Sequence, residues 1–243
     1  NIVTSYEDLD TLVPFVESLL NEFPEITSVV NNINTRKADV SFGEREILLH
    51  GKPIINEKLK DLTFQISANS FFQTNTLMAE KLYDVILNSA NLKGDEIVYD
   101  LYCGAGSISL FLARKAKFVY GFDIIVSSIE NAEQNAIINN IENIDFSVAN
   151  LDSYFERKKS KNLPSPDIVI VDPPRSGMHK KMTEYLPKFR AKKIIYVSCN
   201  PSTQARDAQI LKSHAYELKK LTVVDMFPHT PHVETVGVFE KSK

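Results

Sequence analysis

The first 70 residues show two different patterns of apolar and polar positions. Between Tyr6 and Phe23 the apolar side chains recur every three or four residues, which predicts an amphipathic helix. After this segment, short runs rich in β-branched residues are separated by Gly, Pro and Asn, a pattern typical of strands joined by turns. These runs are ITSVVNNINT, REILLHGKPIINEKL and LTFQISANSFFQ. We therefore expect residues 1–70 to form a small α+β domain.

After Asn75, long helical segments alternate with short apolar runs to the end of the chain. The runs that predict strands are EIVYDLY, FVYGFD, IDFSVAN, DIVIVDPP, KIIYVSC, KKLTVVDMF and ETVGVFE. Most are apolar at consecutive positions, as strands are when helices cover both faces of a sheet. This predicts an α/β fold, namely a doubly wound, Rossmann-like domain with a seven-stranded, mostly parallel sheet. Ligands of such sheets bind at the carboxyl ends of the strands, so candidate chemistry is expected there.

The first of these strands leads into a glycine-containing segment, DLYCGAGSIS, at residues 100–109. Gly104 and Gly106 allow a tight turn and a close approach of the backbone to a ligand, while the following helix offers free N–H groups. Turns of this kind serve many nucleotide cofactors. Ser109 stands where the dinucleotide fingerprint GxGxxG requires a third glycine, so the sequence argues against a nicotinamide-dependent dehydrogenase.

Polar residues also end the second and third predicted strands. Asp123 follows the glycines by about 20 residues, where an acid can accept hydrogen bonds from both ribose hydroxyls. The same aspartate is suited to cap a helix, and Asn150 and Asp152, after the third strand, suit either an adenine edge or a turn. Together, these polar strand ends predict an adenosine-type ligand, in the pattern of S-adenosylmethionine sites.

The fourth predicted strand ends in the segment DIVIVDPPRSG. Its two prolines fix an extended turn without N–H donors, which holds Asp172 at the sheet edge with little freedom. A plain turn that terminates the strand explains the same residues. Arg175, directly after the prolines, is either a surface charge or a contact for a phosphate or a carboxylate.

The fifth predicted strand ends at Cys199, one of only two cysteines in the chain. Asn200 and Pro201 suit the N-cap and the first turn of the next helix, so we expect the sulfur near the positive end of that helix. Such a position favours the thiolate, which is the nucleophilic form of cysteine. A cysteine that only fills space in the core is the alternative, but the strand-end position favours the nucleophile.

The last predicted strand carries Glu234 among apolar neighbours. An acid in such surroundings has a raised affinity for a proton, which suits a general base. A salt-bridged surface glutamate is the alternative. His229 and His232 precede it, but two histidines without a third nearby ligand do not make a metal site, so no metal is expected.

Composition is typical of a soluble globular protein. Charged residues make up 24% of the 243 residues, the net charge is −3, and no apolar run approaches the roughly 20 residues that a membrane helix needs. The first residues lack the features of a signal peptide, so we expect a cytoplasmic protein. Cys103 and Cys199 lack CxxC spacing and are expected to be reduced thiols. Because the chain opens on Asn1 rather than on methionine, we expect that an N-terminal part has been removed.

Seven segments, taken in order, resemble one known family, the S-adenosylmethionine-dependent RNA uracil-5 methyltransferases, which make 5-methyluridine in ribosomal or transfer RNA. The segments are NSFFQTNT (residues 69–76), DLYCGAGSISL, GFD, VAN, VDPPRSG, YVSCNPSTQARD and FPHTPHVETV. The resemblance extends from near Asn34 to the end of the chain. It implies a small central domain at residues 1–70, followed by a methyltransferase domain at residues 71–243.

By this resemblance, Cys199 is the nucleophile that adds to uracil C6, and Glu234 is the base that removes the C5 proton. The candidate residues for binding S-adenosyl-L-methionine or lining the active site, from the strand ends and the resemblance together, are Gln73, Tyr102, Gly104, Gly106, Ser107, Asp123, Asn150 and Asp172. Two positions depart from the family. Asp123 replaces the usual glutamate and is one methylene shorter, so its ribose contact is expected to be longer or mediated by water. Ser107 stands where some members have asparagine.

Full-length members of the family commonly carry an N-terminal RNA-binding barrel, and some carry a four-cysteine iron–sulfur site; this sequence contains neither. The net charge of −3 agrees with a missing RNA-binding domain, because RNA binders usually have a basic surface. Basic residues cluster only locally, at 157–161 and from Lys180 to Lys193. The implied partner is RNA, first 23S ribosomal RNA and alternatively transfer RNA. We expect a monomer without membrane association that methylates RNA less efficiently than a chain with the barrel.

Three other functions share parts of the pattern. An amino-group methyltransferase for adenine or glutamine also uses an acid before two prolines, but the next residue there is usually aromatic rather than Arg175, and no cysteine is required. A hydrolase built on Cys199, His229 and Glu234 leaves the glycine turn unexplained. A catalytically inactive RNA-binding module is opposed by the presence of both Cys199 and Glu234.

Overall fold

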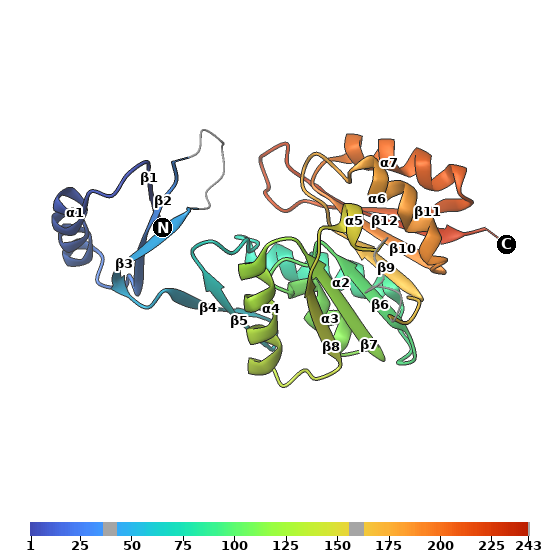
Figure 1. The fold of residues 1–243 in the computed structure, drawn as a ribbon, viewed down its shortest axis with the longest axis horizontal. Helices are drawn as coiled ribbons and strands as arrows, with labels where there is room; N and C mark the ends of the chain where they lie inside the picture. Colours follow the sequence, from blue (N-terminus) through green and yellow to red (C-terminus); the bar gives the residue numbers. More distant parts are fainter. Residues whose placement is uncertain (36–42, 156–162, 243) are drawn as a thin grey trace.

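An open sheet of seven strands forms the larger part of the molecule (Figure 1). The computed structural model describes residues 1–35, 43–155 and 163–242. The strands are β6 (Ile97–Leu101), β7 (Phe118–Asp123), β8 (Ile144–Val148), β9 (Ile168–Val171), β10 (Lys193–Ser198), β11 (Tyr216–Val224) and β12 (Glu234–Lys241). Their spatial order is β11-β12-β10-β9-β6-β7-β8, and β12 runs antiparallel to both of its neighbours while the other pairs are parallel. The predicted sheet is therefore confirmed.

The strand order reverses at β6, which lies between the next strand in the sequence, β7, and a later one, β9. A reversal of this kind leaves a crevice at the carboxyl ends of the strands, where such folds bind their ligands. The segments after β6 and β9 are the predicted glycine turn and the predicted DPP turn. Both predicted turns therefore open onto the same crevice.

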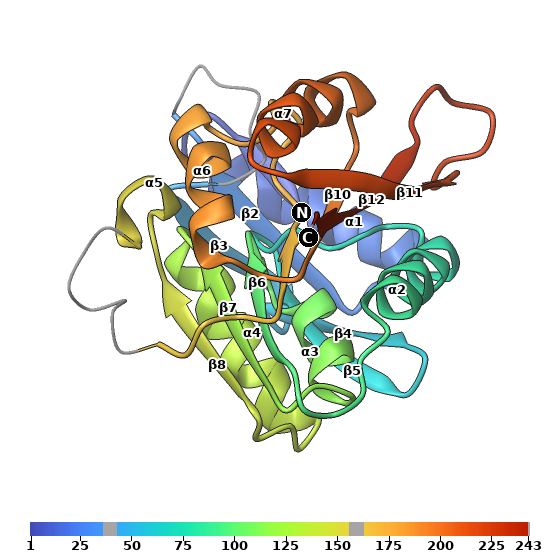
Figure 2. The same cartoon turned by 90° about the vertical axis from the view of Figure 1, so that its right-hand side faces the viewer.

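Helices cover both faces of the sheet (Figures 1 and 2). They are α2 (Thr76–Ala90), α3 (Ser107–Ala113), α4 (Val126–Ile138), α5 (Leu151–Tyr154), α6 (Lys180–Tyr185) with the 3-10 helix η2 (Leu186–Phe189), and α7 (Pro201–Ser213). Residues of α2, α3 and α4 form one apolar core with the sheet, and residues of α5, α6 and α7 form a second core on the other side. We call these sides the α2 face and the α7 face. No helix in the described ranges is long and apolar enough to cross a membrane.

A smaller unit lies at the left of Figure 1 and contains β1 (Ile2–Thr4), α1 (Leu9–Glu22), β2 (Ser28–Ile33) and β3 (Arg45–Gly51). Its three strands form a separate sheet in the order β1-β2-β3. The predicted N-terminal helix is confirmed. Asp8 caps its start by accepting a hydrogen bond from the Thr11 N–H (3.2 Å), and the helix buries Leu12 and Val16. The strand β1 was not predicted, because three residues are too few to show a period.

A hairpin of β4 (Ile54–Leu59) and β5 (Leu62–Ser67) lies between the small unit and the large sheet (Figure 1). Its residues Leu59, Leu62 and Phe64 are buried in the core of the α2 face. The α4 side chain of Asn135 also accepts a hydrogen bond from the Gln65 N–H (2.7 Å). The hairpin thus packs against the seven-stranded sheet, and the division of the chain near residue 70 stays a prediction.

Candidate active site

The turn after β6 takes a tight path because three of its residues have a positive φ. These are Tyr102 (67°), Gly104 (54°) and Gly106 (81°). A Cβ atom on Gly106 would lie 2.9 Å from the ring of Phe146, so glycine is required there by space as well as by conformation. The N–H groups of Tyr102 and Cys103 donate to the carbonyl of Phe122 at 2.9 and 3.0 Å, which holds the turn against the end of β7.

Asp123, at the end of β7, connects this turn to the next one. One carboxylate oxygen accepts the Gly104 N–H (3.0 Å) and the other accepts the Ile125 N–H (2.9 Å). The helix α4 begins one residue later, with Ile125 as its N-cap. Asp123 therefore fixes the glycine turn and the start of the following loop together, while its predicted contact with a ribose stays a prediction.

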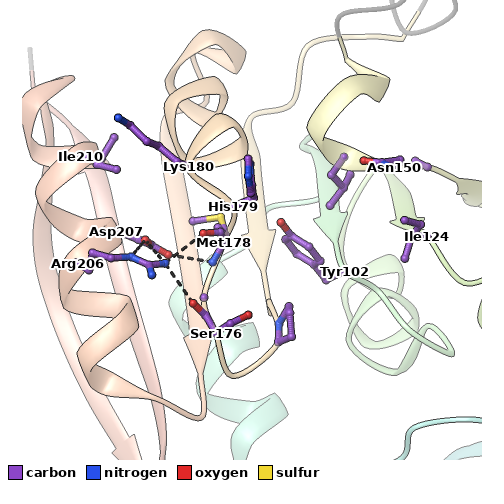
Figure 3. A pocket seen from close by; sticks show the side chains of 14 residues that line it. Tyr102, Ile124, Asn150, Ser176, Met178, His179, Lys180, Arg206, Asp207 and Ile210 are labelled. Atoms are coloured by element: carbon purple, nitrogen blue, oxygen red, sulfur yellow. Dashed lines mark hydrogen bonds and ion pairs between the residues drawn. The ribbon is translucent and has the colours of Figure 1, made fainter. Parts of the chain in front are cut away.

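A pocket of about 710 Å³ opens beside these turns (Figure 3). It lies between the segment that follows β8 and the helix α7. Its lining residues are Tyr102, Ile124, Ala149, Asn150, Leu151, Pro174, Ser176, Gly177, Met178, His179, Lys180, Arg206, Asp207 and Ile210. Two of the candidate cofactor residues, Tyr102 and Asn150, are among them. Of the other candidates, Gly104 and Gly106 form the glycine turn, Ser107 begins the helix after it, and Asp123 accepts a hydrogen bond from it.

The wall of this pocket formed by the DPPRSGM segment is held to α7 by a buried aspartate. Asp207 is 1% exposed and accepts hydrogen bonds from the Met178 N–H (3.0 Å) and the Tyr196 hydroxyl (2.8 Å). Arg206 donates to the carbonyls of Ser176 (3.3 Å) and Met178 (3.1 Å), as Figure 3 shows. Neither residue was assigned a role from the sequence, although both belong to the YVSCNPSTQARD segment. They keep the DPP turn in one position.

Cys199 and Glu234 lie opposite each other at the ends of two paired strands. In the antiparallel register of β10 and β12, Ser198 pairs with Thr235, so the next residue outward on each strand is Cys199 or Glu234. Val197, two residues before Cys199, and Val236, two residues after Glu234, are both buried in the α2-face core. Alternate residues of a strand share a face, so both side chains project to the α2 face.

The same alternation brings two aspartates to this face. Asp172 lies two residues beyond Ile170 on β9, and Asp100 lies two residues beyond Val98 on β6, and both of these apolar residues belong to the α2-face core. The hydroxyl of Tyr83, a buried residue of α2, donates to the Ser107 Oγ (3.1 Å) on the same side. The predicted residues Cys199, Glu234, Asp172 and Ser107 therefore gather in one acidic site.

Burial sets the protonation of the two carboxyl groups. It raises the pKa of Asp172 to about 7, and it raises the pKa of Glu234 to about 7 with a further contribution from the negative charge of Asp172. The prediction that apolar neighbours raise the proton affinity of Glu234 is confirmed. A group with such a pKa exchanges protons readily near neutral pH, as a general base requires.

The predicted lowering of the Cys199 pKa is wrong for this structure. Asn200 does cap α7 by accepting the Ser202 N–H (3.1 Å), and Pro201 occupies the first turn, as predicted. However, burial raises the pKa of the thiol, and the negative charges of Glu234 and Asp172 raise it further, against the opposing effect of Arg175. Burial acts most strongly, and the two carboxyl groups from other strands add to it because they lie on the same face as the sulfur.

Asp100 is a candidate functional residue that the sequence analysis did not single out. It is fully buried, its Oδ2 accepts a hydrogen bond from the Ser109 hydroxyl, and its Oδ1 has no hydrogen-bond partner among the described residues. Burial raises its pKa to about 7 against the opposing effect of Ser109, and Asp172 and Asp123 raise it further. Its position directly before the glycine turn was the sequence feature that could have identified it. Ser109, the residue that broke the dinucleotide fingerprint, is its partner.

The three raised pKa values predict how stability changes with pH. Between about pH 4 and pH 7, folded Asp100, Asp172 and Glu234 retain protons that the unfolded chain has released, so the free energy of unfolding falls as pH rises through this range. Asp100→Asn removes one of these groups. We expect this variant to lose less stability than the wild type from pH 5 to pH 8, and to exceed it at pH 8 by about 1–3 kcal/mol.

Thermal unfolding followed by circular dichroism, without added ligand, measures this difference. The exposed Asp95 provides the matched control, since Asp95→Asn makes the same chemical change at the surface. An unchanged pH dependence in Asp100→Asn would show that the buried carboxyl group does not carry the effect.

The segment that contains Gln73 is attached to the loop before β12. Asn75 caps α2 by accepting the Met78 N–H (3.2 Å), and its amide donates to the carbonyl of Met226 (2.8 Å). This contact joins two segments 151 residues apart, NSFFQTNT and the one before FPHTPHVETV. It places half-buried Gln73 near the loop that leads to Glu234.

The predicted basic clusters are only partly described. Residues 157–161 lie outside the described residues. In the second cluster, Lys188 lies 4.7 Å from the ring centre of Tyr185, and Lys192 pairs with Asp167 at 3.0 Å. Lys180 lines the pocket. Within the described ranges, no group of three or more His, Cys, Asp or Glu residues is arranged to hold a metal ion.

Residues 44–243 match the model of a protein family described as tRNA (uracil-5-)-methyltransferase. The chain belongs to this family. The family resemblance predicted from the seven segments is therefore confirmed. The family match covers the glycine turn, the DPP turn, Cys199 and Glu234, which are the elements that meet at the site described above.

Individual relatives agree with the family match. An uncharacterised RNA methyltransferase of Oceanobacillus iheyensis is 45% identical over 91% of this chain, and one of Chlorobaculum tepidum is 41% identical over 100% of it. These matches take in 48% and 51% of the relatives, so the chain spans about half the length of the curated relatives it matches.

Two solved structures show the same architecture. The Pyrococcus abyssi tRNA (uracil-54, C5)-methyltransferase in complex with S-adenosyl-L-homocysteine has a TM-score of 0.76 and 36% identity, covering 98% of this chain and 55% of that chain. Magnesium protoporphyrin IX methyltransferase of Synechocystis, with S-adenosylmethionine bound, has a TM-score of 0.54 and 17% identity over 69% of this chain and 81% of that chain. At this identity the second likeness concerns the fold alone.

Proposed function

We propose that the protein transfers a methyl group from S-adenosyl-L-methionine to C5 of a uridine in RNA, with Cys199 as covalent nucleophile and Glu234 as base. The observation that carries the proposal is the strand register that sets Cys199 opposite Glu234 on the α2 face, next to Asp172. A thiol that adds to a pyrimidine ring and a base that completes the reaction must both reach the same ring. Family membership supports the choice of uracil.

The residues around the glycine turn fit S-adenosyl-L-methionine. This cofactor carries cationic groups and an adenosine, and it supplies an electrophilic methyl group when bound. The unpartnered, buried oxygen of Asp100 is suited to a cationic group, while Tyr102 and Asn150 line a pocket beside the end of β7, where Asp123 is placed for a ribose. The Pyrococcus relative, which binds the demethylated form of this cofactor, supports the assignment.

The chemistry of uracil explains the roles of the two central residues. Uracil C5 is a poor nucleophile, but addition of the Cys199 sulfur to C6 pushes an electron pair toward C5, which can then take up a methyl group. Asp172, with a pKa near 7, can accept the proton that the thiol must lose, which leaves Glu234 as a carboxylate for the later step. Afterwards Glu234 as carboxylate removes the C5 proton, the C5–C6 double bond forms again, and the sulfur leaves C6. The uracil must leave its stack to reach the half-buried sulfur.

Asp123→Ala tests the assignment of the cofactor site. We expect this substitution to weaken binding of S-adenosyl-L-homocysteine by about 10- to 100-fold, because it removes a charged acceptor and loosens the glycine turn at Gly104. Isothermal titration calorimetry measures the affinity. Asp145→Ala, at an exposed position near the start of β8, is the matched control and should bind like the wild type. Equal affinity of all three proteins would exclude Asp123 from the site.

Within this proposal the substrate is 23S ribosomal RNA, with transfer RNA as the alternative. The site described above recognises a uracil and does not distinguish the two RNAs. Mass spectrometry of nucleosides from each RNA fraction, in cells with and without the gene, tests the assignment. Loss of 5-methyluridine from 23S RNA alone supports the proposal, and loss from transfer RNA alone supports the alternative. We further propose that the enzyme acts in the cytoplasm and that a separate RNA-binding domain raises its efficiency.

A further inference from the structure

Two buried polar residues on the α7 face, Gln204 and Thr235, lie behind the nucleophile and the base. Gln204 is 5% exposed and Thr235 is 2% exposed. Thr235 directly follows Glu234 in β12, and its register partner Ser198 directly precedes Cys199 in β10. The reaction steps proposed above use neither side chain, so their burial requires another explanation.

These side chains join the two strands to α7. The Thr235 hydroxyl lies 3.1 Å from the carbonyl oxygen of Ser198 and 2.9 Å from Gln204 Oε1, and its single proton serves one of these acceptors at a time. Gln204 Nε2 donates to the carbonyl oxygen of Tyr196 at 2.8 Å.

The nucleophile has a second side-chain support. Ser198 and Asn200, on either side of Cys199, exchange two hydrogen bonds of 3.0 Å, from the Ser198 hydroxyl to the Asn200 carbonyl and from the Asn200 N–H to the Ser198 oxygen. Glu234 follows a loop and is the first residue of β12, where its backbone pairs with Val224 of β11. Thr235 is therefore the first anchored side chain after the base. Loss of the hydroxyl is expected to displace Glu234 more than Cys199.

We infer that Gln204 and Thr235 are positioning residues, which hold Glu234 at the distance from Cys199 that removal of the C5 proton requires. The inference rests on the proposed function. It goes beyond it by assigning to this hydrogen-bonded pair an effect on one step, the release of the methylated RNA. A displacement of about 1 Å at a reacting group can cost about 100-fold in rate, so a short bridge of this kind is enough to matter.

The test separates the early steps from release by using two RNA probes. They are in vitro transcripts of 23S ribosomal RNA and of a transfer RNA, made with either uridine or 5-fluorouridine. A 5-fluorinated ring has no C5 proton to remove, so the enzyme remains attached through Cys199 after methyl transfer, and the rate of attachment reports only the early steps. Turnover on the uridine transcripts includes release.

We expect Thr235→Val, in the protein as its gene encodes it, to lower turnover on uridine RNA by about tenfold or more, while attachment to 5-fluorouridine RNA changes by less than about threefold. Thr235→Ser keeps the hydroxyl and should retain at least about half of the turnover. Gln204→Met should behave like Thr235→Val, and the double variant should be no slower than the slower single variant, because both changes break one bridge.

Several results would overturn the inference. They are wild-type turnover in both Thr235→Val and Gln204→Met, an equal loss in turnover and attachment, or the same loss in Thr235→Ser as in Thr235→Val. Binding of S-adenosyl-L-homocysteine by calorimetry identifies variants that fold, and Gln204→Met carries the test if Thr235→Val does not fold. If the wild-type enzyme itself never attaches to 5-fluorouridine RNA, the covalent mechanism fails, and the inference fails with it.

Discussion

Replacement of Cys199 by alanine is expected to abolish RNA methylation, with a loss of roughly 10⁴-fold or more. Without the sulfur, nothing adds to uracil C6, and C5 remains too poor a nucleophile to take a methyl group. The other thiol, Cys103, is buried in the turn between β6 and α3 and cannot replace it. The rate of tritium transfer from labelled S-adenosyl-L-methionine to RNA measures the loss.

The same variant should also form no covalent complex with RNA on a denaturing gel. Calorimetry with S-adenosyl-L-homocysteine provides the control, because Cys199 lies outside the pocket-lining set and its loss should leave that affinity unchanged. Methylated uridine made by Cys199→Ala at more than a small fraction of the wild-type rate would rule out covalent catalysis by this residue.

Glu234→Gln is expected to stop the reaction at a later point. The amide cannot accept the C5 proton, so turnover should fall by about 10²- to 10⁴-fold while attack and methyl transfer still occur. The stalled enzyme then migrates with its RNA on a denaturing gel, in contrast to Cys199→Ala. Glu240→Gln, at the far end of the same strand, makes the same chemical change away from the site and should turn over normally.

Two outcomes for Glu234→Gln would change the role assigned to Glu234. Normal turnover without accumulated complex would mean that another residue removes the proton, and Asp172, with its pKa near 7 on the same face, would be tested next, followed by His229. Loss of both turnover and complex formation would place Glu234 in the first step, as the acceptor of the Cys199 proton.

The sheet and its strand ends could be predicted from the sequence because their signals are local. Apolar runs such as IVIV in β9 identify central strands, and the residues that follow each run are then assigned to the ligand-binding edge. Cys199 was found in this way, whereas Glu234 was found as an acid among apolar neighbours, and the family resemblance then assigned both residues to steps of one reaction. Their placement opposite each other depends on the register between β10 and β12, which the structure provides.

What the sequence could not predict depends on contacts between distant segments. The direction of the Cys199 pKa shift was wrong because the thiol is partly buried and because the negative charges of Glu234 and Asp172, from other strands, raise its pKa further. The bridge between Gln204 and Thr235 spans 31 residues. Asp100 and Ser109 are close in sequence, but nothing in the DLYCGAGSIS segment indicates that one oxygen of Asp100 is left without a partner. Local patterns identify strand ends and not the pairings between them.

The position of the transferred methyl group tests most directly whether the protein methylates C5 of uridine through Cys199. The protein is incubated with unmodified RNA and S-adenosyl-L-methionine that carries a deuterated methyl group, and the nucleosides are separated and identified by mass spectrometry. We expect the label in 5-methyluridine with the wild-type protein and no labelled 5-methyluridine with the Cys199→Ala variant. Label in an N-methylated adenosine, or 5-methyluridine formed equally well by Cys199→Ala, would contradict this expectation.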